Sequence, residues 1–296
     1  MPASDGTQLY GVIGHPVAHS LSPFLMNRAF RQLDIDAVYL RFDVQPDHLD
    51  RAIEGLTALG AYGANVTYPF KDEILHLVDL PSPDAELIGA VNTLAFRDDQ
   101  IIGHNTDASG AAVALATFGE MTPDDKHVFI FGAGGSGRAA AVGLLREGAA
   151  SVTFGVRSPR SVVETAKKFR ASFPLQSVDV VPLDDSGALD YRRYAFERAD
   201  VVINATPVGT RGGEETPLVY DLDCIRPGQC FFDFVYHSGR TAFLETAASR
   251  GARVLGGLAL LVCQAVDSFR LWTGRPFDVP AMFEALAAAF PERTVS

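Results

Sequence analysis

The feature that most constrains this chain is a glycine-rich segment directly after a buried strand. Residues 128–131 form the apolar run Val-Phe-Ile-Phe, and Gly132-Ala-Gly-Gly-Ser-Gly137 follows at once. An alanine-rich stretch with helical character, 138–147, comes next. Glycines at this spacing allow a tight turn and bring backbone N–H groups close to a pyrophosphate at a helix N-terminus. The segment predicts a dinucleotide-binding βα unit, and the alternative is an ordinary glycine-rich turn.

Strand-like and helix-like stretches alternate through the chain after this segment. The further strand candidates are 151–156, 178–182, 200–203, 230–234 and 253–255. Helices lie between most of them, and this alternation predicts a parallel sheet. Two more helices, about 258–272 and 279–290, follow the final strand and could pack on either domain.

The first 107 residues predict a second α/β arrangement. The expected strands are 9–14, 37–43 and 61–66, a strand-turn-strand follows in 86–102, and helices are expected from Ser22, over 46–59, from Phe70 and from about Asp107. Ser22 followed by Pro23 is a typical helix start, with the hydroxyl as the N-cap. Pro69 favours a turn that leads into the helix from Phe70. At 296 residues the chain has room for two cores.

Composition excludes several classes of protein. The net charge of −11 opposes binding to nucleic acid and to anionic membranes. No apolar run is long enough to span a bilayer, and the N-terminus does not resemble a secretory signal. The three cysteines include no C-x-x-C pair, so we expect reduced thiols, no metal site and a cytoplasmic protein.

The strand after the glycine-rich helix indicates which dinucleotide is bound. An NAD site usually has an acidic residue there to hold the ribose 2′-hydroxyl. No acidic residue occurs between Gly148 and Val163, where Arg157 and Arg160 stand instead. A guanidinium suits a 2′-phosphate, so NADP is favoured and NAD stays possible. The turn 204–209 follows another strand and is expected to border the nicotinamide.

Lys71 lies shortly after the expected strand 61–66, near the carboxyl edge of its sheet. Ligands bind at that edge in open α/β sheets. A lysine there can donate a proton or carry charge. The alternative is a solvated lysine at a helix start, where the helix dipole disfavours a cation.

Several segments together resemble the shikimate dehydrogenase family along nearly the whole chain. They begin at Gly14, Gly63, Gly89, Gly103, Gly132, Asn204, Asp233 and Gly257, and read GHPVAHSLSP, GANVTYPFK, GAVNT, GHNTD, GAGGSGR, NATPVG, DFVY and GLALLVCQ. The resemblance implies a substrate-binding domain of residues 1–107 plus 257–296 and a Rossmann-type NADP-binding domain of residues 108–256. The C-terminal helices would return to the first domain.

The resemblance also implies roles for individual positions. Lys71 and Asp107 fall on the family's catalytic pair. Substrate-binding positions are Ser20, Ser22, Thr67, Asn92, Tyr236 and Gln264. Cofactor-binding positions are Gly132, Ala133, Gly134, Gly135, Ser136, Gly137, Arg157, Ser158, Arg160, Asn204, Thr206, Pro207 and Gly257. Val156 and Ser158 depart from the family's usual residues on either side of Arg157.

These residue types suit the implied reaction, the NADP-dependent reduction of 3-dehydroshikimate to shikimate in chorismate and aromatic amino acid biosynthesis. Serine hydroxyls can hold a carboxylate without burying an ion pair, and amides can bond ring hydroxyls. The Lys71 ammonium can supply the proton or anchor the oxygen, positioned by Asp107.

Each of these residues also has a purely structural alternative. Ser22 and Asp107 could cap helices, Asn92 could serve its turn, and Gln264 could be a satisfied core amide.

Two alternatives for the function remain open. One is a quinate or aminoshikimate dehydrogenase, which could use NAD or NADP. The other is a metabolite-sensing relative without catalysis, against which the presence of both Lys71 and Asp107 argues. We expect a monomer or homodimer.

Overall fold

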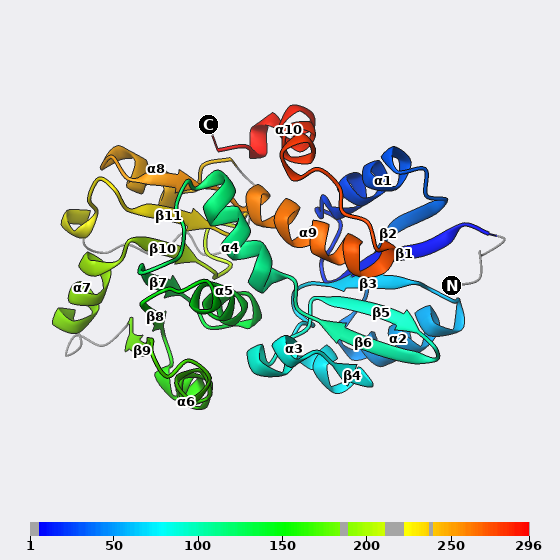
Figure 1. Ribbon diagram of the computed structural model, residues 1–296, viewed down its shortest axis with the longest axis horizontal. Helices are drawn as coiled ribbons and strands as arrows, with labels where there is room; N and C mark the ends of the chain where they lie inside the picture. Colours follow the sequence, from blue (N-terminus) through cyan, green and yellow to red (C-terminus); the bar gives the residue numbers. More distant parts are fainter. Residues whose placement is uncertain (1–5, 184–188, 211–221, 237–238, 296) are drawn as a thin grey trace. The chain divides into compact units, whose positions relative to one another are not determined.

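The protein is described by a computed structural model that covers residues 6–183, 189–210, 222–236 and 239–295. The chain divides into two compact units. Unit 1 is Met1–Thr106 with Gln264–Met282, and unit 2 is Asp107–Cys263 with Phe283–Ser296. Each unit is built on a six-stranded sheet of described residues (Figure 1). The predicted α/β class is confirmed.

Unit 1 has a mixed sheet of order β2-β1-β3-β5-β6-β4. Its strands are β1 (Gln8–Gly14), β2 (Ala37–Asp43), β3 (Gly63–Val66), β4 (Leu80–Pro81), β5 (Thr93–Arg97) and β6 (Gln100–His104). Its helices are α1 (Ser22–Gln32), α2 (Leu49–Ala58) and α3 (Pro83–Ile88), together with most of α9 (Gly257–Thr273). Strand β1 pairs in parallel with β2 and β3, whereas β5 runs antiparallel to β3 and β6.

Helices cover both faces of this sheet. On one face, Ile53 and Leu56 of α2 share a buried cluster with Val66 of β3. On the other, Trp272 of α9 lies against β3, and its Nε1 donates to the carbonyl of Leu94 at 2.8 Å. A Cβ at Gly63 would lie 2.2 Å from Trp272 Nε1. The glycine therefore lets α9 pack directly on the strand that leads to Lys71.

Unit 2 has an all-parallel sheet of order β12-β11-β10-β7-β8-β9. Its strands are β7 (His127–Phe131), β8 (Ser151–Val156), β9 (Ser177–Pro182), β10 (Val201–Asn204), β11 (Cys230–Asp233) and β12 (Arg253–Leu255). Its helices are α4 (Asp107–Phe118), α5 (Gly135–Arg146), α6 (Val163–Ser172), α7 (Leu189–Arg198) and α8 (Ala242–Ser249), and α10 (Val279–Ala289) begins in unit 1 and ends here. In chain order the strands form the two halves of a doubly wound Rossmann sheet.

Aromatic side chains fill one face of the unit 2 sheet. Phe129 and Phe131 of β7 cluster with Phe196 of α7 and Phe243 of α8. The other face of β7 is buried as well, so this strand is an unbroken apolar run, as expected for a parallel strand covered on both faces. The chain leaves this sheet at its carboxyl edge through Gly132, Arg157, Asn204 and Asp233, where a Rossmann sheet binds its ligand.

Two local predictions are wrong. The helix expected from Phe70 is a turn followed by the four-residue 3₁₀ helix Glu73–His76. This 3₁₀ helix is followed by strand β4, which begins at Leu80. Ser22 is not the N-cap of α1, because the cap position is Leu21 and no side chain caps the helix. Ser22 is instead the first helical residue and is buried, so the capping alternative for its hydroxyl is not supported.

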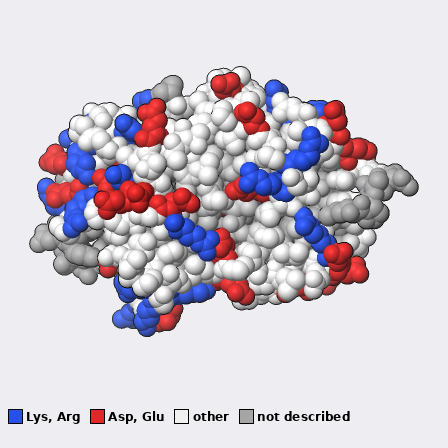
Figure 2. All heavy atoms as spheres, in the orientation of Figure 1, with Lys and Arg blue, Asp and Glu red and all other residues white. Residues whose placement is uncertain are grey.

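Three observations on the described residues concern helix length, surface charge and the cysteines. No helix in the described ranges is long and apolar enough to cross a membrane. On the face shown in Figure 2, acidic and basic side chains are interspersed. The three cysteines, all within described segments, are buried and form no disulfide.

Candidate active site

The glycine-rich turn of unit 2 has the geometry of an anion site. Helix α5 begins at Gly135, and the cap residue Gly134 has no side chain to cover the first N–H groups. A Cβ built on Gly134 would meet nothing within 4 Å. The N-terminus of α5 therefore faces open space, and the N–H groups of a helix start together with the helix dipole favour an anion there.

The other glycines of this turn are required by close packing. Gly132 has a φ of +88°, in the left-handed region. A Cβ at Gly137 would lie 2.3 Å from the carbonyl oxygen of Gly132. Arg138 Nη1 donates to the carbonyl of Ala133 at 3.0 Å and closes the turn from the helix side. Residues 132–137, including Ser136, thus fit a pyrophosphate of a dinucleotide.

Arg157 follows β8, the neighbouring strand on the sheet. Arg157, Ser158 and Arg160 line the segment after this strand, and Arg160 lies in the 3₁₀ helix Pro159–Ser161. The hydroxyl of Ser161 donates to the carbonyl of Ser158 at 2.7 Å and holds this turn. Two guanidinium groups therefore stand past the strand where an acidic residue would favour NAD.

The turn after β10 is organised by the side chain of Asn204. Its Nδ2 donates to the carbonyl of Val208 at 3.0 Å. Its Oδ1 accepts from the backbone N–H of Thr206 at 3.0 Å and from the Thr206 hydroxyl at 2.7 Å. Pro207 lies between these anchors, and its carbonyl accepts from the N–H of Thr210 at 3.1 Å. Asn204 thus fixes the turn from inside, because it is completely buried.

Gly257 packs against the segment after β11, which also carries Tyr236. A Cβ at Gly257 would lie 2.5 Å from the carbonyl oxygen of Phe234, so only glycine lets α9 begin there. Tyr236 is half-buried and stands two residues further along the same segment.

Ser20 and Ser22 lie together between β1 and α1 in unit 1. Both are buried, and the Ser20 hydroxyl accepts from the N–H of Ser22 at 3.3 Å. The carbonyl of Ser20 accepts from Arg41 through Nε at 3.0 Å and through Nη2 at 2.7 Å. The Arg41 guanidinium therefore fixes the backbone of the serine pair and adds positive potential beside it, which favours a carboxylate.

Thr67 and Lys71 share the turn after β3. The N–H of Thr67 donates to the carbonyl of Ile13 at 2.9 Å, which ties the turn to β1. A Cβ at Gly14 would lie 2.4 Å from Thr67 Cγ2, so this glycine admits the threonine. The carbonyl of Lys71 accepts from the N–H of Val91 at 2.8 Å, and the lysine is half-buried. Lys71 is thus held beside the segment that carries Asn92.

The carboxamide of Asn92 has a fixed orientation. Its Oδ1 accepts from the backbone N–H of Thr106 at 2.8 Å, and a backbone N–H can only donate. The Asn92 Nδ2 donates to the Thr106 hydroxyl at 3.0 Å. That hydroxyl is 3.4 Å from Oε1 of Gln264. One threonine therefore joins two residues that are 172 positions apart in the numbering, and both carboxamides are buried.

A wider set of neutral polar side chains supports this pair. Ser268 lies one helical turn after Gln264, and its hydroxyl is 3.1 Å from that of Thr106 and 2.9 Å from that of Thr93. Asn65 of β3 donates to the hydroxyls of Thr93 and Ser268, each at 3.0 Å. All these groups are amides or hydroxyls. Amides and hydroxyls thus form a buried polar network in unit 1.

Asp107 follows Thr106 directly and is the first residue of α4 and of unit 2. It is buried, with 5% of its surface exposed. The residue before it is anchored, because the Thr106 N–H is bonded to Asn92 as described. Burial lowers the pKa of His104 nearby, with the Arg97 guanidinium as a second cause, so this imidazole is neutral at pH 7.

The structure groups the predicted residues by unit. Unit 1 holds Ser20, Ser22, Thr67, Lys71, Asn92 and Gln264, and unit 2 holds Asp107, Tyr236 and the predicted cofactor residues. Sequence reasoning missed Arg41, Asn65, Thr93, Thr106 and Ser268. A signal existed for four of them, because three lie inside the quoted motifs and Ser268 shares a helix face with Gln264.

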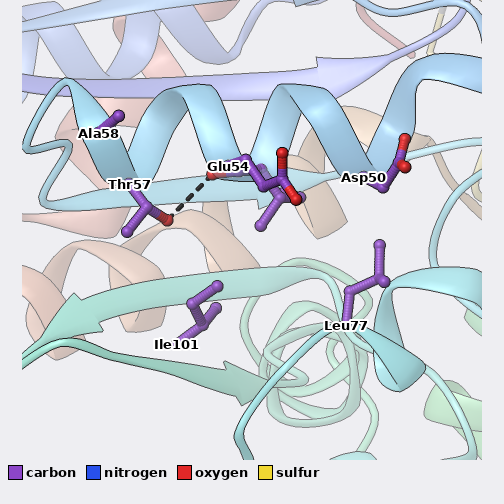
Figure 3. Close-up of a pocket in the computed structure, with 7 residues that line it drawn as sticks. Asp50, Glu54, Thr57, Ala58, Leu77 and Ile101 are labelled. Carbon is purple, nitrogen blue, oxygen red and sulfur yellow. Dashed lines mark hydrogen bonds between the residues drawn. The ribbon is translucent and has the colours of Figure 1, made fainter.

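A separate hollow of about 470 Å³ lies in unit 1 beside α2 (Figure 3). Its lining residues are Asp50, Ile53, Glu54, Thr57, Ala58, Leu77 and Ile101. The Thr57 hydroxyl donates along the helix to the carbonyl of Ile53 at 3.0 Å. None of the predicted site residues lines this hollow, so we assign it no part in the reaction.

Two family models match the chain. The shikimate dehydrogenase substrate binding domain matches residues 12–94. The shikimate 5′-dehydrogenase C-terminal domain matches residues 257–287.

Relatives match over nearly the full length. A shikimate dehydrogenase (NADP(+)) of Moorella thermoacetica is 42% identical over 284 residues, which are 96% of this chain and 94% of the relative. A Listeria monocytogenes shikimate 5-dehydrogenase, solved with shikimate and NAD, is 32% identical with a TM-score of 0.85, over 95% of this chain and 96% of that one. A Thermus thermophilus shikimate 5-dehydrogenase, solved with NADP(H) and shikimate, is 32% identical with a TM-score of 0.81, over 96% of this chain and 100% of that one.

Proposed function

Because this chain belongs to the shikimate dehydrogenase family, we propose that it is an NADP-dependent oxidoreductase that interconverts 3-dehydroshikimate and shikimate. The observation that carries the proposal is the 42% identity over 96% of the chain to a relative named for NADP(+). That similarity includes the part that would bind substrate as well as the nucleotide-binding sheet. The reaction belongs to aromatic amino acid biosynthesis, and the three buried, unbridged cysteines support a cytoplasmic location.

We assign substrate binding to residues 1–107 with 257–296, and cofactor binding to residues 108–256. Ser20 and Ser22 hold the substrate carboxylate with neutral hydroxyls, and Arg41 adds positive potential behind them. Thr67, Asn92 and Gln264 bond the ring hydroxyls, and Tyr236 lies beside the substrate. Hydroxyl and carboxamide groups suit this task because they bind neutral hydroxyls without a buried charge.

The hydrogen bonds of unit 1 determine which group of the Asn92 carboxamide faces the protein. Since Asn92 Oδ1 accepts from the Thr106 N–H, the Asn92 amide turns its oxygen to the protein. Its NH₂ group donates to the Thr106 hydroxyl at 3.0 Å. We therefore propose that Asn92 meets an oxygen of the substrate through its NH₂ group rather than through its oxygen.

Lys71 and Asp107 carry the proton chemistry. The Lys71 ammonium donates a proton to the carbonyl oxygen as it gains negative charge, or stabilises that charge in place. Asp107 positions the ammonium and bonds the same hydroxyl. The half-buried setting of Lys71 strengthens both effects, because charges interact more strongly away from bulk water.

Residues of unit 2 hold the cofactor, which when bound supplies or accepts the hydride. Residues 132–137 bind the pyrophosphate at the N-terminus of α5. Arg157, Ser158 and Arg160 bind the 2′-phosphate. Asn204, Thr206, Pro207 and Gly257 border the nicotinamide.

The proposal is tested by following nicotinamide absorbance with shikimate and quinate, each with NADP⁺ and with NAD⁺. We expect the highest kcat/KM with shikimate and NADP⁺. Turnover only with quinate and NAD⁺ would overturn the substrate and cofactor assignments. A complete lack of turnover, with shikimate still bound in calorimetry, would identify a sensor.

A further inference from the structure

Asp233 is a completely buried carboxylate at the end of β11. Three donors converge on it. Asn204 Nδ2 and the N–H of Val235 donate to Oδ1 at 2.9 and 3.0 Å. The Thr241 hydroxyl donates to Oδ2 at 2.5 Å. Burial of a carboxylate is costly unless it is paired or fully hydrogen-bonded, and these donors supply the bonds.

The three donors come from three different segments. Asn204 ends β10 and shapes the turn that contains Thr206 and Pro207. Val235 precedes Tyr236 directly. Thr241 is the N-cap of α8, where its hydroxyl accepts from the N–H of Leu244 at 3.4 Å. One side chain is thus bonded to both predicted ligand-bearing segments of this edge and to a helix start.

Packing brings the turn and the helix start together as well. Gly209, which ends the turn after β10, has a φ of +93°. A Cβ there would lie 3.3 Å from Thr241 Cγ2. The turn therefore lies against Thr241, and its position depends on where Asp233 holds that residue.

A carboxylate is the side chain that can satisfy all three donors. Both of its oxygens accept hydrogen bonds, whereas asparagine would direct an NH₂ group at one of the donors. Burial raises the pKa of Asp233 to about 6, with the hydrogen bonds from Thr241, Val235 and Asn204 acting in the opposite sense. The group is therefore ionised at pH 7.5 and acts as an acceptor.

We propose that Asp233 is a positioning residue for hydride transfer, whose carboxylate holds the Asn204–Gly209 turn and the Tyr236 segment in mutual register at the carboxyl edge of the sheet. This inference rests on the proposed function, because the two segments are those assigned to the nicotinamide and the substrate. Asp233 itself touches neither ligand. Its effect is on the geometry of the reacting groups, to which rates are sensitive.

The Thr241 hydroxyl offers the cleanest test, because it can be removed while the carboxylate stays. Thr241→Val deletes the donor with little change in volume, and Thr241→Ser keeps it. Ser82→Ala is the matched control, since Ser82 caps α3 through the N–H of Ala85 at 3.2 Å and belongs to unit 1. Asp233→Asn tests the carboxylate directly. For each variant, kcat, KM for shikimate, the Kd of NADPH by fluorescence and Tm are measured.

We expect Thr241→Val and Asp233→Asn to lower kcat on the order of 10- to 100-fold, since small misplacements of reacting groups have effects of this size. The Kd of NADPH changes less than about threefold, because the pyrophosphate and 2′-phosphate sites lie on other turns. Thr241→Ser restores kcat.

The proposal is overturned if Thr241→Val lowers Tm as Ser82→Ala does but leaves kcat unchanged. If Asp233→Asn does not fold, the Thr241 pair decides. Failure of the proposed function is distinguishable, because wild-type protein would then not oxidise shikimate.

Discussion

The two units each contain a buried polar network at the site, and the networks differ in charge. In unit 1, hydrogen bonds between amides and hydroxyls link Asn65, Asn92, Thr93, Thr106 and Ser268. In unit 2, Asn204 and Thr241 are linked through the carboxylate of Asp233. Bonds between amides and hydroxyls avoid the desolvation cost of an ion. The second network uses one ion as a junction, and so its stability depends on pH.

The strongest effect is expected at Lys71, the basic side chain that we propose as the proton donor in unit 1. Amides and hydroxyls are poor acids at neutral pH, and we therefore propose Lys71 as the residue that supplies the proton. Lys71→Ala should lower kcat by about 10²- to 10⁴-fold, as expected for loss of an acid–base group. The KM for shikimate should change little, because the serines and amides remain. A large rise in KM at unchanged kcat would mean that Lys71 only binds substrate. Initial rates at saturating NADP⁺ give both constants.

The next effect is the pH dependence of stability that the Asp233 carboxylate gives to the unit 2 network. The pKa of Asp233 in the folded protein is raised by burial to about 6, from an ordinary value of 3.8. The folded state therefore binds this proton more tightly than the unfolded state, and the stability from this group is full below pH 3.8 and is lost as pH rises to about 6. The loss is about 3 kcal/mol at most, since one pKa unit corresponds to about 1.4 kcal/mol.

Asp233→Asn removes this titration. Urea unfolding at pH 4.5 and pH 7 should show the wild type losing stability relative to the variant as pH rises. Asp98→Asn serves as the control, because Asp98 is an exposed carboxylate with a φ of +51° that asparagine also tolerates. Equal differences between wild type and Asp233→Asn at both pH values would show that Asp233 is not titrating in this range.

A smaller effect is expected at the cofactor end of unit 2. Arg157→Gln should weaken the binding of NADP⁺ by about 10- to 100-fold, because hydrogen bonds to charged groups contribute about 1.5–3 kcal/mol. NAD⁺ lacks the 2′-phosphate and should be affected much less. Lys167→Gln removes one charge from exposed α6 in the same unit and is the control. Equal weakening of NADP⁺ and NAD⁺ by Arg157→Gln would contradict the assignment. Fluorescence titrations with each cofactor provide the comparison.

The weakest effect is expected from the neutral network itself. Ser268→Ala removes a hydroxyl that contacts Asn65, Thr93 and Thr106, and should cost about 1–3 kcal/mol of stability. The KM for shikimate should rise several-fold, because Ser268 supports the Thr106 hydroxyl that contacts the carboxamides of Asn92 and Gln264. Thr273→Ala is the control on the same helix, where the Thr273 hydroxyl donates to the carbonyl of Phe269 at 2.8 Å. If Ser268→Ala and Thr273→Ala give the same KM, the network does not orient the amides.

Much of this organisation could be predicted from the sequence. The strand before Gly132 and the βα alternation after it predicted the parallel sheet, because such strands are buried on both faces. The motifs around Asn92 and Asp233 predicted which segments carry the site. The helix from Phe70 was mispredicted, because its apolar spacing resembles that of an α-helix, whereas the segment forms a turn and one 3₁₀ helix before strand β4.

Two parts of the site could not be predicted. The contacts of Arg41 with the Ser20 carbonyl and of Thr241 with Asp233 depend on tertiary placement, which no spacing rule contains. The orientation of Asn92 likewise follows from a single backbone N–H that only the fold brings to it. Sequence patterns thus single out candidate ligand-binding residues, whereas the residues that hold these candidates in place appear only in the fold.

The neutral network of unit 1 is proposed to serve the substrate, and the charged turns of unit 2 to serve the cofactor. Calorimetric titration of shikimate and of NADPH into Asn92→Ala and Arg157→Gln tests this division of labour. We expect Asn92→Ala to raise the Kd of shikimate about tenfold or more, as for a lost polar contact, and to change the Kd of NADPH less than about threefold. We expect Arg157→Gln to raise the Kd of NADPH by a similar factor and to leave the Kd of shikimate nearly unchanged. Weakening of both ligands to the same extent by either substitution would show that the two networks do not serve separate ligands.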